Sequence, residues 1–294
     1  MRIPDVIKKA VVFIGIQAEP GDIKFCGTGF FISMPSTRVP NHNFIYLITA
    51  RHVVEGINGR DFYVRLNTKD GKSHTFQGDN QVTWWYHPND NEHKKTDVAV
   101  YFMLFPRGLT QKLDFSAIPS VSILTDELIK SEGVGDGDEV CIAGLFSHHS
   151  GNEKNLPIIR TGNIAMMPDE PITANRYGKM ESYLIECKSI GGLSGSPVFA
   201  LKPTAVLLGN SPVQTTQWKM FLLGLIHGHF NSPENKMDTT IEDSEETRKM
   251  NVGIAIVTPA KKILEIINHE GLAKYRHEME EKKIAENSSQ PDKQ

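Results

Sequence analysis

The feature that most constrains this chain is a succession of short apolar segments separated by turn residues. Asn-Gly, Asp-Gly and Pro-Asn-Asp stretches lie between the segments and favour turns. Many short strands with little helix between them are typical of antiparallel barrels and sandwiches. The first set of predicted strands is Val11–Ile16, Gly29–Ile32, Phe44–Thr49, Phe62–Leu66, Val82–Tyr86 and Val98–Leu104. The second set is Glu139–Leu145, Leu156–Met167, Tyr183–Cys187, Pro197–Leu201, Phe221–His227 and Val252–Val257.

A polar stretch at residues 107–120 separates the two sets and predicts a linker between two barrels of similar size. We therefore expect an N-terminal barrel over residues 1–115 and a C-terminal barrel over residues 116–258. The acidic segment Asn231–Met250 lies between two predicted strands and is expected to form a long surface loop.

One helix is predicted after the last strand, over residues 259–285. Thr258 is a candidate N-cap, and Pro259 suits the first helical position. The chain then becomes highly charged, and residues 286–294 are predicted to be a disordered tail. The apolar face of the helix is formed by Ile263, Leu264, Ile266 and Ile267.

Composition argues against several classes of protein. The 32 Lys and Arg against 35 Asp and Glu give a formal charge of −3, so bulk electrostatics do not favour nucleic acid as a partner. The longest uncharged apolar run, Ala10–Ile16, is too short to span a membrane and makes a poor signal peptide. Three widely spaced cysteines, Cys26, Cys141 and Cys187, indicate a reducing compartment. We therefore expect a cytoplasmic protein with no membrane partner, and the sequence leaves its oligomeric state open.

The run Gly191-Gly192-Leu193-Ser194-Gly195-Ser196-Pro197 is a candidate nucleophile loop. Glycines around a serine permit a tight turn that points several N–H groups at one place, as an oxyanion requires. Ser189 and Ser196 are alternatives to Ser194, but only Ser194 has glycine close on both sides. A plain glycine- and serine-rich turn is the ordinary structural alternative.

Two further residues are candidates for activating that serine. His52 follows a buried strand directly, on rigid scaffold, and a neutral imidazole is the usual base for a serine hydroxyl. Asp97 stands at the head of another apolar strand, where it could orient the imidazole or simply cap a turn.

Taken together, these motifs resemble the trypsin-like (chymotrypsin-fold) serine peptidases, especially bacterial members related to glutamyl endopeptidases and Htr-type peptidases. The resemblance spans roughly residues 10–268, nearly all of the predicted folded part. The matching stretches, in the order of the chain, are Gly27-Thr28-Gly29-Phe30, Leu47-Ile48-Thr49-Ala50-Arg51-His52, Thr96-Asp97-Val98-Ala99-Val100 and Gly192-Leu193-Ser194-Gly195-Ser196-Pro197.

The resemblance implies an all-β fold of two six-stranded antiparallel barrels with the active site between them. It implies that His52 is the general base, Asp97 its orienting partner and Ser194 the nucleophile of a serine endopeptidase. The N–H groups of Gly192 and Ser194 would form the oxyanion hole. No cofactor or metal is implied, and the partner is a protein or peptide substrate.

The specificity pocket is predicted less directly. In this family the residue six before the nucleophile, here Lys188, lies at the pocket floor, and the wall comes from the segment that holds His227 and His229. A one-residue offset from the glutamyl endopeptidase pattern turns His227 away from the pocket unless a bulge restores it. If one of these cations lines the pocket, we expect a preference for Glu, Asp or Gln before the scissile bond. The acidic segment Asn231–Met250 follows this wall and could cover the pocket.

Two other functions use the same residues. A peptidase fold can hold peptides without cutting them, and the same site can hydrolyse esters. A complete set of three catalytic residues favours an enzyme over a binding module. Peptide and ester substrates are not distinguished by the sequence. The histidine pairs His148/His149 and His227/His229 lack the acid or cysteine partners of a metal site.

Overall fold

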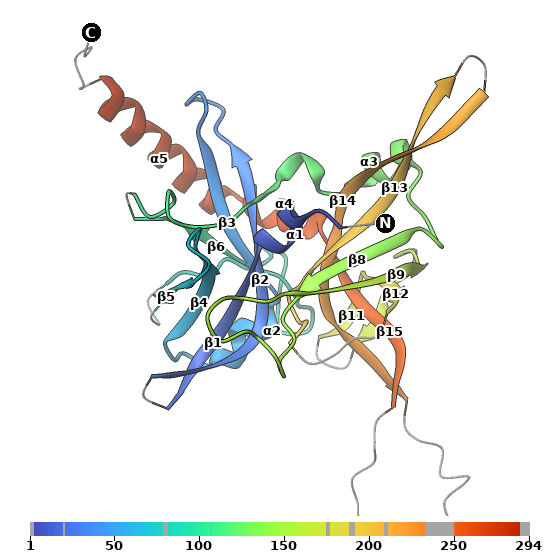
Figure 1. Cartoon of the computed structure of the whole chain (residues 1–294), viewed down its shortest axis with the longest axis horizontal. Coiled ribbons are helices and arrows are strands. Elements are labelled where there is room, and N and C mark those ends of the chain that lie inside the picture. The colour runs from blue at the N-terminus through green and yellow to red at the C-terminus, as the bar shows by residue number, and fades with distance from the viewer. Residues whose placement is uncertain are drawn as a thin grey trace, which may run out of the picture.

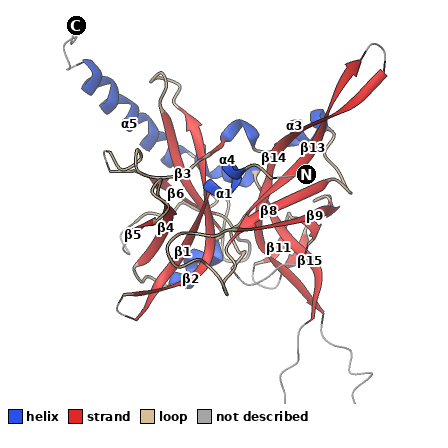
Figure 2. Cartoon of the chain, viewed as in Figure 1, coloured by secondary structure: helices blue, strands red, loops and turns tan. Residues whose placement is uncertain are grey.

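The computed structural model describes residues 3–19, 21–78, 82–106, 108–174, 177–187, 192–208, 211–232 and 250–288. Two β-rich halves pack together, and a C-terminal helix extends away from them (Figure 1). Helices are few and short apart from that one (Figure 2). The predicted fold class, an all-β protein with a C-terminal helix, is confirmed.

The described residues of the first half form seven strands and two short helices. It is a sheet in the order β5-β4-β1-β2-β3-β6, antiparallel throughout, with β7 pairing in parallel with β2. These elements are α1 (Asp5–Lys9), β1 (Val11–Glu19), β2 (Asp22–Pro35), β3 (Asn43–Thr49), α2 (Arg51–Ile57), β4 (Phe62–Asn67), β5 (Ser73–Gly78), β6 (Ala99–Met103) and β7 (Ile118–Pro119).

The described strands of this half form an open sheet and not the closed barrel that the resemblance implies. The segment Val82–Tyr86, predicted to be a strand, pairs with β6 only through a bridge between Trp85 and Val100. Its aromatic side chains pack instead, with the Trp84 ring 5.6 Å from that of Phe62. Among the described residues, this segment therefore does not form the strand that would join β5 to β6 and close a barrel.

The second half forms the predicted six-stranded antiparallel barrel, which closes in the order β12-β15-β14-β13-β8-β9. A separate hairpin, β10 with β11, lies beside it. The elements are a 3-10 helix η1 (Ser120–Ser122), α3 (Asp126–Glu132), β8 (Glu139–Gly144), β9 (Ile158–Met166), β10 (Ile172–Ala174), β11 (Gly178–Met180), β12 (Tyr183–Glu186), β13 (Pro197–Leu208), β14 (Ser211–Ser232) and β15 (Met250–Pro259).

The end of the chain differs from the single predicted helix. Two helices follow the barrel, α4 (Lys261–Ile267) and α5 (Glu270–Ser288), and Ala260 stands at the N-cap of α4. Thr258 is not a helix cap, because it pairs with Leu225 as part of β15. Residues 286–288, predicted to be disordered, belong to α5, and the rest of the predicted tail, residues 289–294, lies outside the described residues.

The two halves share a core. One apolar cluster contains Phe13 and Phe31 of the first half together with Phe199 and Leu222 of the second. Helix α5 follows the second half in the sequence but packs on the first, where the Tyr275 ring lies 4.9 Å from Phe102. This shared packing holds the junction between the halves, where the candidate site lies. No helix in the described ranges is long and apolar enough to cross a membrane.

Candidate active site

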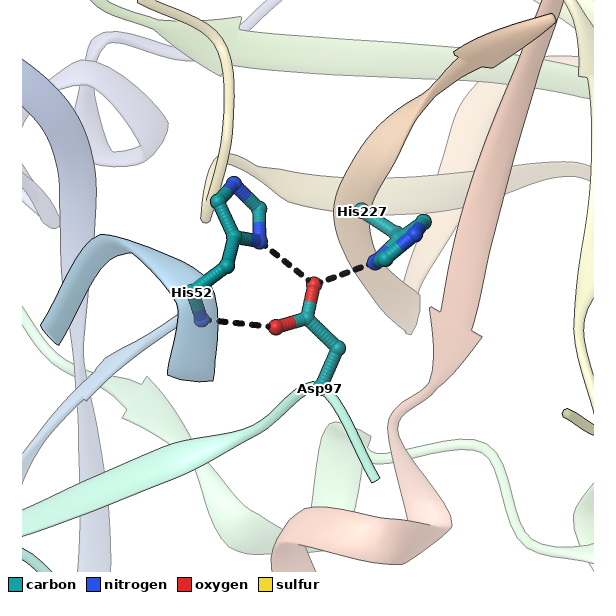
Figure 3. Close-up of side chains that lie close together, drawn as sticks. All are labelled: His52, Asp97 and His227. Atoms are coloured by element: carbon teal, nitrogen blue, oxygen red, sulfur yellow. Dashed lines mark hydrogen bonds and ion pairs between the residues drawn. The ribbon is translucent and has the colours of Figure 1, made fainter. Parts of the chain in front are cut away.

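A buried carboxylate, Asp97, lies at the centre of the candidate site, on the loop that leads into β6 (Figure 3). Its Oδ1 accepts a 2.9 Å hydrogen bond from the backbone N–H of His52, and its Oδ2 lies 2.8 Å from Nδ1 of the same residue. Oδ2 also lies 2.5 Å from Nδ1 of His227. Burial raises the pKa of a carboxyl group, but the hydrogen bonds from His227 and His52 outweigh burial and hold the pKa of Asp97 well below its usual range. Asp97 is therefore an ionised acceptor at neutral pH.

His52 lies in the first turn of α2, directly after β3. The first N–H groups of a helix have no partner within it, and Ala50 at the N-cap offers no side-chain acceptor. Asp97 supplies one through Oδ1. A single carboxylate thus caps the helix and orients the imidazole that the helix carries.

Asp90 ties the Asp97 loop to α2. Its carboxylate accepts hydrogen bonds from Nη1 of Arg51, at 2.6 Å, and from the backbone N–H of Thr96, at 2.8 Å. The Arg51 guanidinium also lies 4.3 Å from the centre of the Tyr86 ring. The residue before His52 and the residue before Asp97 are therefore both bound to the carboxylate of Asp90.

The two described serines of the nucleophile loop differ in exposure. Ser194 is partly exposed, whereas Ser196 is fully buried and its Oγ has no hydrogen-bond partner. A buried hydroxyl cannot reach a substrate, so the structure favours Ser194 over Ser196. Ser189 lies outside the described residues.

Thr28, a buried residue of β2, holds the nucleophile loop against the first half. Its N–H donates to the Ser194 carbonyl at 2.9 Å, and its Oγ1 donates to the Gly192 carbonyl at 2.8 Å. The same Oγ1 accepts the N–H of Leu145 at 2.9 Å. Thr28 belongs to a motif that the sequence singled out, but its bonding role was not predicted.

Gly195 explains why this loop needs glycine. Its φ of +82° is strained for other residues, and an added Cβ would overlap the carbonyl oxygen of Thr28. The same Cβ would lie 3.0 Å from the backbone nitrogen of Ala50. The loop that carries Ser194 therefore packs against the β3–α2 junction that carries His52.

The oxyanion role of Gly192 and Ser194 stays a prediction. Within the described part of the chain, the N–H groups of Gly192 and Ser194 donate no hydrogen bond to the protein. Gly192 has a φ of +97°, a backbone conformation that favours glycine. The next N–H, that of Gly195, is occupied by the Ile226 carbonyl at 2.8 Å.

Of the predicted pocket residues, the structure describes the side chain of His227 alone. In β14 and β15, Ile226 pairs with Val257 and Gly228 pairs with Ile256, so His227 is the extra residue of a β-bulge. Bulges re-aim side chains. The bulge on which the pocket role of His227 depended is present, and it directs the ring to Asp97 (Figure 3). Lys188, the His229 side chain and most of the acidic segment lie outside the described residues.

Two neighbours of the site were not predicted. The Tyr177 hydroxyl donates to the Glu55 carboxylate at 2.6 Å, and its ring lies 5.9 Å from that of His227. Burial raises the pKa of Glu55, but hydrogen bonds from Tyr177 and Arg51 outweigh burial and lower it. Tyr177 comes from the turn between β10 and β11, where the sequence carries no pattern that points to the site.

The donor atoms of His52, Asp97 and His227 lie within 4.8 Å of one another and could be read as a metal site. A zinc ion holds nitrogen and oxygen ligands at about 2.0–2.2 Å, which separates tetrahedral ligand atoms by roughly 3.3 Å. The observed N–O separations of 2.8 and 2.5 Å are both shorter than this, and the first lies within the range of an N–H···O hydrogen bond.

Comparisons with known proteins add little at the level of sequence. No protein-family model matches the chain, and no curated protein does. Among solved structures, Rv3671c from M. tuberculosis H37Rv (an inactive Ser343Ala mutant) matches with a TM-score of 0.44 and 17% identity, over 89% of this chain and 87% of that one. Deg5 matches with a TM-score of 0.46 and 13% identity, over 88% of each chain.

A third structure, described as the HtrA-type protease AlgW with a decapeptide, matches with a TM-score of 0.46 and 16% identity. That match covers 89% of this chain and 65% of AlgW. AlgW is named as a member of a group that the sequence motifs resemble. At these identities and TM-scores the chemistry has to be argued from the residues of this chain.

Proposed function

We propose that this protein is a serine endopeptidase with Ser194 as nucleophile, His52 as general base and Asp97 as the residue that orients His52. The observation that carries the proposal is the pair of half-buried His52 and buried Asp97, joined at 2.8 Å beside a glycine-bounded serine loop. The packing of Gly195 against Ala50 brings this loop to the first turn of α2.

In the proposed reaction, Ser194 Oγ attacks the carbonyl carbon of a peptide bond while its proton passes to Nε2 of His52. The negative charge on the tetrahedral intermediate is stabilised by the N–H groups of Gly192 and Ser194. The imidazolium, stabilised by Asp97, then gives its proton to the departing amine, and an acyl-enzyme forms. A water molecule, deprotonated by His52, releases the acid product and restores the serine.

The arrangement favours an enzyme over a module that only binds peptides. An orienting carboxylate buried at 0% exposure is costly unless its charge is used or fully satisfied. Peptide binding requires neither a buried acid–imidazole pair nor a loop with two unoccupied N–H groups. Esterase activity uses the same atoms, and peptide and ester substrates are compared directly in the test below.

The proposed partner is a protein or peptide substrate, and nothing in the charge of the chain favours nucleic acid. A preference for Glu, Asp or Gln before the scissile bond stays part of the proposal, carried by Lys188 and His229. Profiling a peptide library tests it, and a strong preference for Lys or Arg at that position would exclude an acidic-selective pocket. We also propose a cytoplasmic location, because the three cysteines are few and widely spaced in the sequence.

The decisive experiment is labelling of the native protein with a fluorophosphonate probe. We expect a covalent adduct on Ser194, found by peptide mapping, and none in Ser194→Ala. Ser196→Ala is the matched control, because it removes a buried hydroxyl without a partner and should label normally. A folded wild-type protein that takes up no probe would point to the binding module. Parallel rates on a fluorogenic peptide and its ester would rank the two activities.

A further inference from the structure

Asp97 has more hydrogen-bond donors than a base–acid pair requires. Its Oδ1 is occupied by the His52 N–H at 2.9 Å, and its Oδ2 is shared by two imidazoles, at 2.8 Å from His52 and 2.5 Å from His227. The two rings meet edge to face, with centroids 5.6 Å apart. From this sharing we propose that His227 is a positioning residue, which fixes the orienting carboxylate and limits the charge that it offers to His52. The inference rests on the proposed function.

The protonation states follow from the acceptor. An ionised carboxylate can only accept hydrogen bonds, so each imidazole must carry its proton on Nδ1. This leaves Nε2 of His52 as the basic atom. The carboxylate thus sets the tautomer of both rings, and the His227 ring is held firmly because its side chain is only 8% exposed.

The effect of His227 on His52 is electrostatic as well as geometric. Each hydrogen bond to Oδ2 neutralises part of the negative charge that would otherwise stabilise an imidazolium at His52. With His227 in place, Asp97 is therefore a weaker partner for that imidazolium than a carboxylate with a single imidazole. Removing the second donor strengthens the pull of Asp97 on the proton of His52 and frees the carboxylate to move.

The position of His227 also links Asp97 to the nucleophile loop. The residue before it, Ile226, accepts the N–H of Gly195 at 2.8 Å and donates its own N–H to the Ser196 carbonyl at 2.9 Å. A shift of the loop is therefore transmitted to the bulge and from there to Asp97. Through the side chain of His227, the second half contacts the acid–base pair of the first.

The other charged groups near the cluster form a balanced set. Tyr177 faces His227 from the β10–β11 turn and donates to Glu55. On α2, Glu55 is paired with Arg51 at 2.9 Å, and from the Asp97 loop Lys95 lies 3.5 Å from it. Arg51 is also paired with Asp90 at 2.6 Å, so two acids and two cations balance one another, and the Asp97 carboxylate is the dominant charge in contact with the two rings.

The test compares His227→Leu with His227→Asn. The two side chains are nearly the same size, and the Asn amide nitrogen occupies the place of Nδ1 and can donate to Oδ2, whereas Leu cannot. Neither titrates, so the difference between them reports the donor alone. The readout is the second-order rate constant for fluorophosphonate labelling of the folded full-length chain from pH 5 to 9.

We expect His227→Leu to label roughly 10- to 100-fold more slowly than His227→Asn at the pH plateau, because a carboxylate without its second donor no longer fixes the His52 ring, and this loss of position outweighs the stronger pull on the proton. We also expect the acid limb of its profile to lie at higher pH than that of His227→Asn. Equal plateaus and coincident acid limbs for the two variants would overturn the inference.

A second measurement keeps the inference separate from the proposed function. Proton NMR of the wild-type chain should show two downfield imidazole N–H signals, one of which is absent in both His227 variants. A single downfield signal in the wild type, unchanged in the variants, would overturn the shared carboxylate whether or not the protein is an enzyme. If both signals are present and the wild type fails to label, the proposed function falls and the shared carboxylate stands.

Discussion

The two halves of the molecule hold their parts of the candidate site by different means. In the first half, His52 is fixed by two hydrogen bonds to the buried carboxylate of Asp97. In the second, Ser194 is carried by a loop whose backbone carbonyls are bonded by Thr28 and whose shape depends on glycine. The acid–base side should therefore be sensitive to charge and pH, and the nucleophile side to backbone geometry.

The largest expected effect comes from removing the nucleophile. Ser194→Ala should lower kcat by about 10⁶-fold, by analogy with other enzymes that use a Ser-His-Asp unit. Adding His52→Ala should lower it little further, because the residues act together. Hydrolysis of a fluorogenic peptide selected by library profiling measures both. Normal turnover by Ser194→Ala would show that Ser194 is not the nucleophile on which His52 acts.

Charge on the acid–base side is tested by Asp97→Asn. The amide presents an N–H₂ donor toward rings that also donate, so the orientation and tautomer of His52 are lost. We expect kcat to fall by about 10⁴-fold. Asp22→Asn, at an exposed position in β2, is the control and should be unchanged. A fall of less than tenfold for Asp97→Asn would mean that His52 does not depend on this carboxylate.

Backbone geometry on the nucleophile side is tested by Gly195→Ala. The added Cβ meets the Thr28 carbonyl at a φ of +82°, so we expect a loss of about 2–4 kcal/mol in the free energy of unfolding. Gly56→Ala is the control, since a Cβ there meets open space within α2 and should be neutral or stabilise by about 0.5–1 kcal/mol. Urea unfolding compares the two, and equal stabilities would show that the loop is free to relax.

The acid–base side should also lose stability in acid. The pKa of Asp97 is lower in the folded chain than in the unfolded one, so the unfolded state binds more protons as pH falls. The stabilisation is fully present above the ordinary aspartate range near pH 4 and is lost progressively below it. Urea unfolding of wild type and Asp97→Asn from pH 7 to 3 should therefore give converging stabilities. A constant difference between them over that range would contradict the depressed pKa.

The contrast between the halves also explains how far the sequence could predict this site. His52, Asp97 and Ser194 stand in short local motifs, each beside a strand whose apolar pattern is clear, and the structure places the first two in contact. The closed second barrel was predicted for the same reason. What could not be predicted depends on register and long-range packing, which a local pattern does not encode.

His227 is the clearest example. Whether its ring faces a pocket or Asp97 depends on one extra residue in β14 where that strand pairs with β15. Such a bulge leaves no local signature in Gly224-Leu225-Ile226-His227. The open first sheet also depends on long-range packing. Trp84 and Trp85 suit a strand by residue type, but the Trp84 ring packs on Phe62 and Trp85 forms only a single bridge to β6. Tyr177 reaches the site from a hairpin turn far away in the sequence.

The smallest expected effect concerns Thr28, a residue of the first half that holds the nucleophile loop of the second. Thr28→Val keeps the shape of the side chain but removes the hydroxyl that donates to the Gly192 carbonyl and accepts the Leu145 N–H. The backbone N–H of Thr28 still bonds Ser194, so the loop keeps one of its two anchors. We expect labelling by a fluorophosphonate to slow by roughly tenfold. The free energy of unfolding should fall by about 1–3 kcal/mol, because two hydrogen bonds are lost and the Leu145 N–H has no acceptor. Thr28→Ser restores the hydroxyl and should recover most of the rate. If Val and Ser label at the same rate, the nucleophile loop owes its geometry to its own glycines, and the first half contributes to it only the Thr28 backbone.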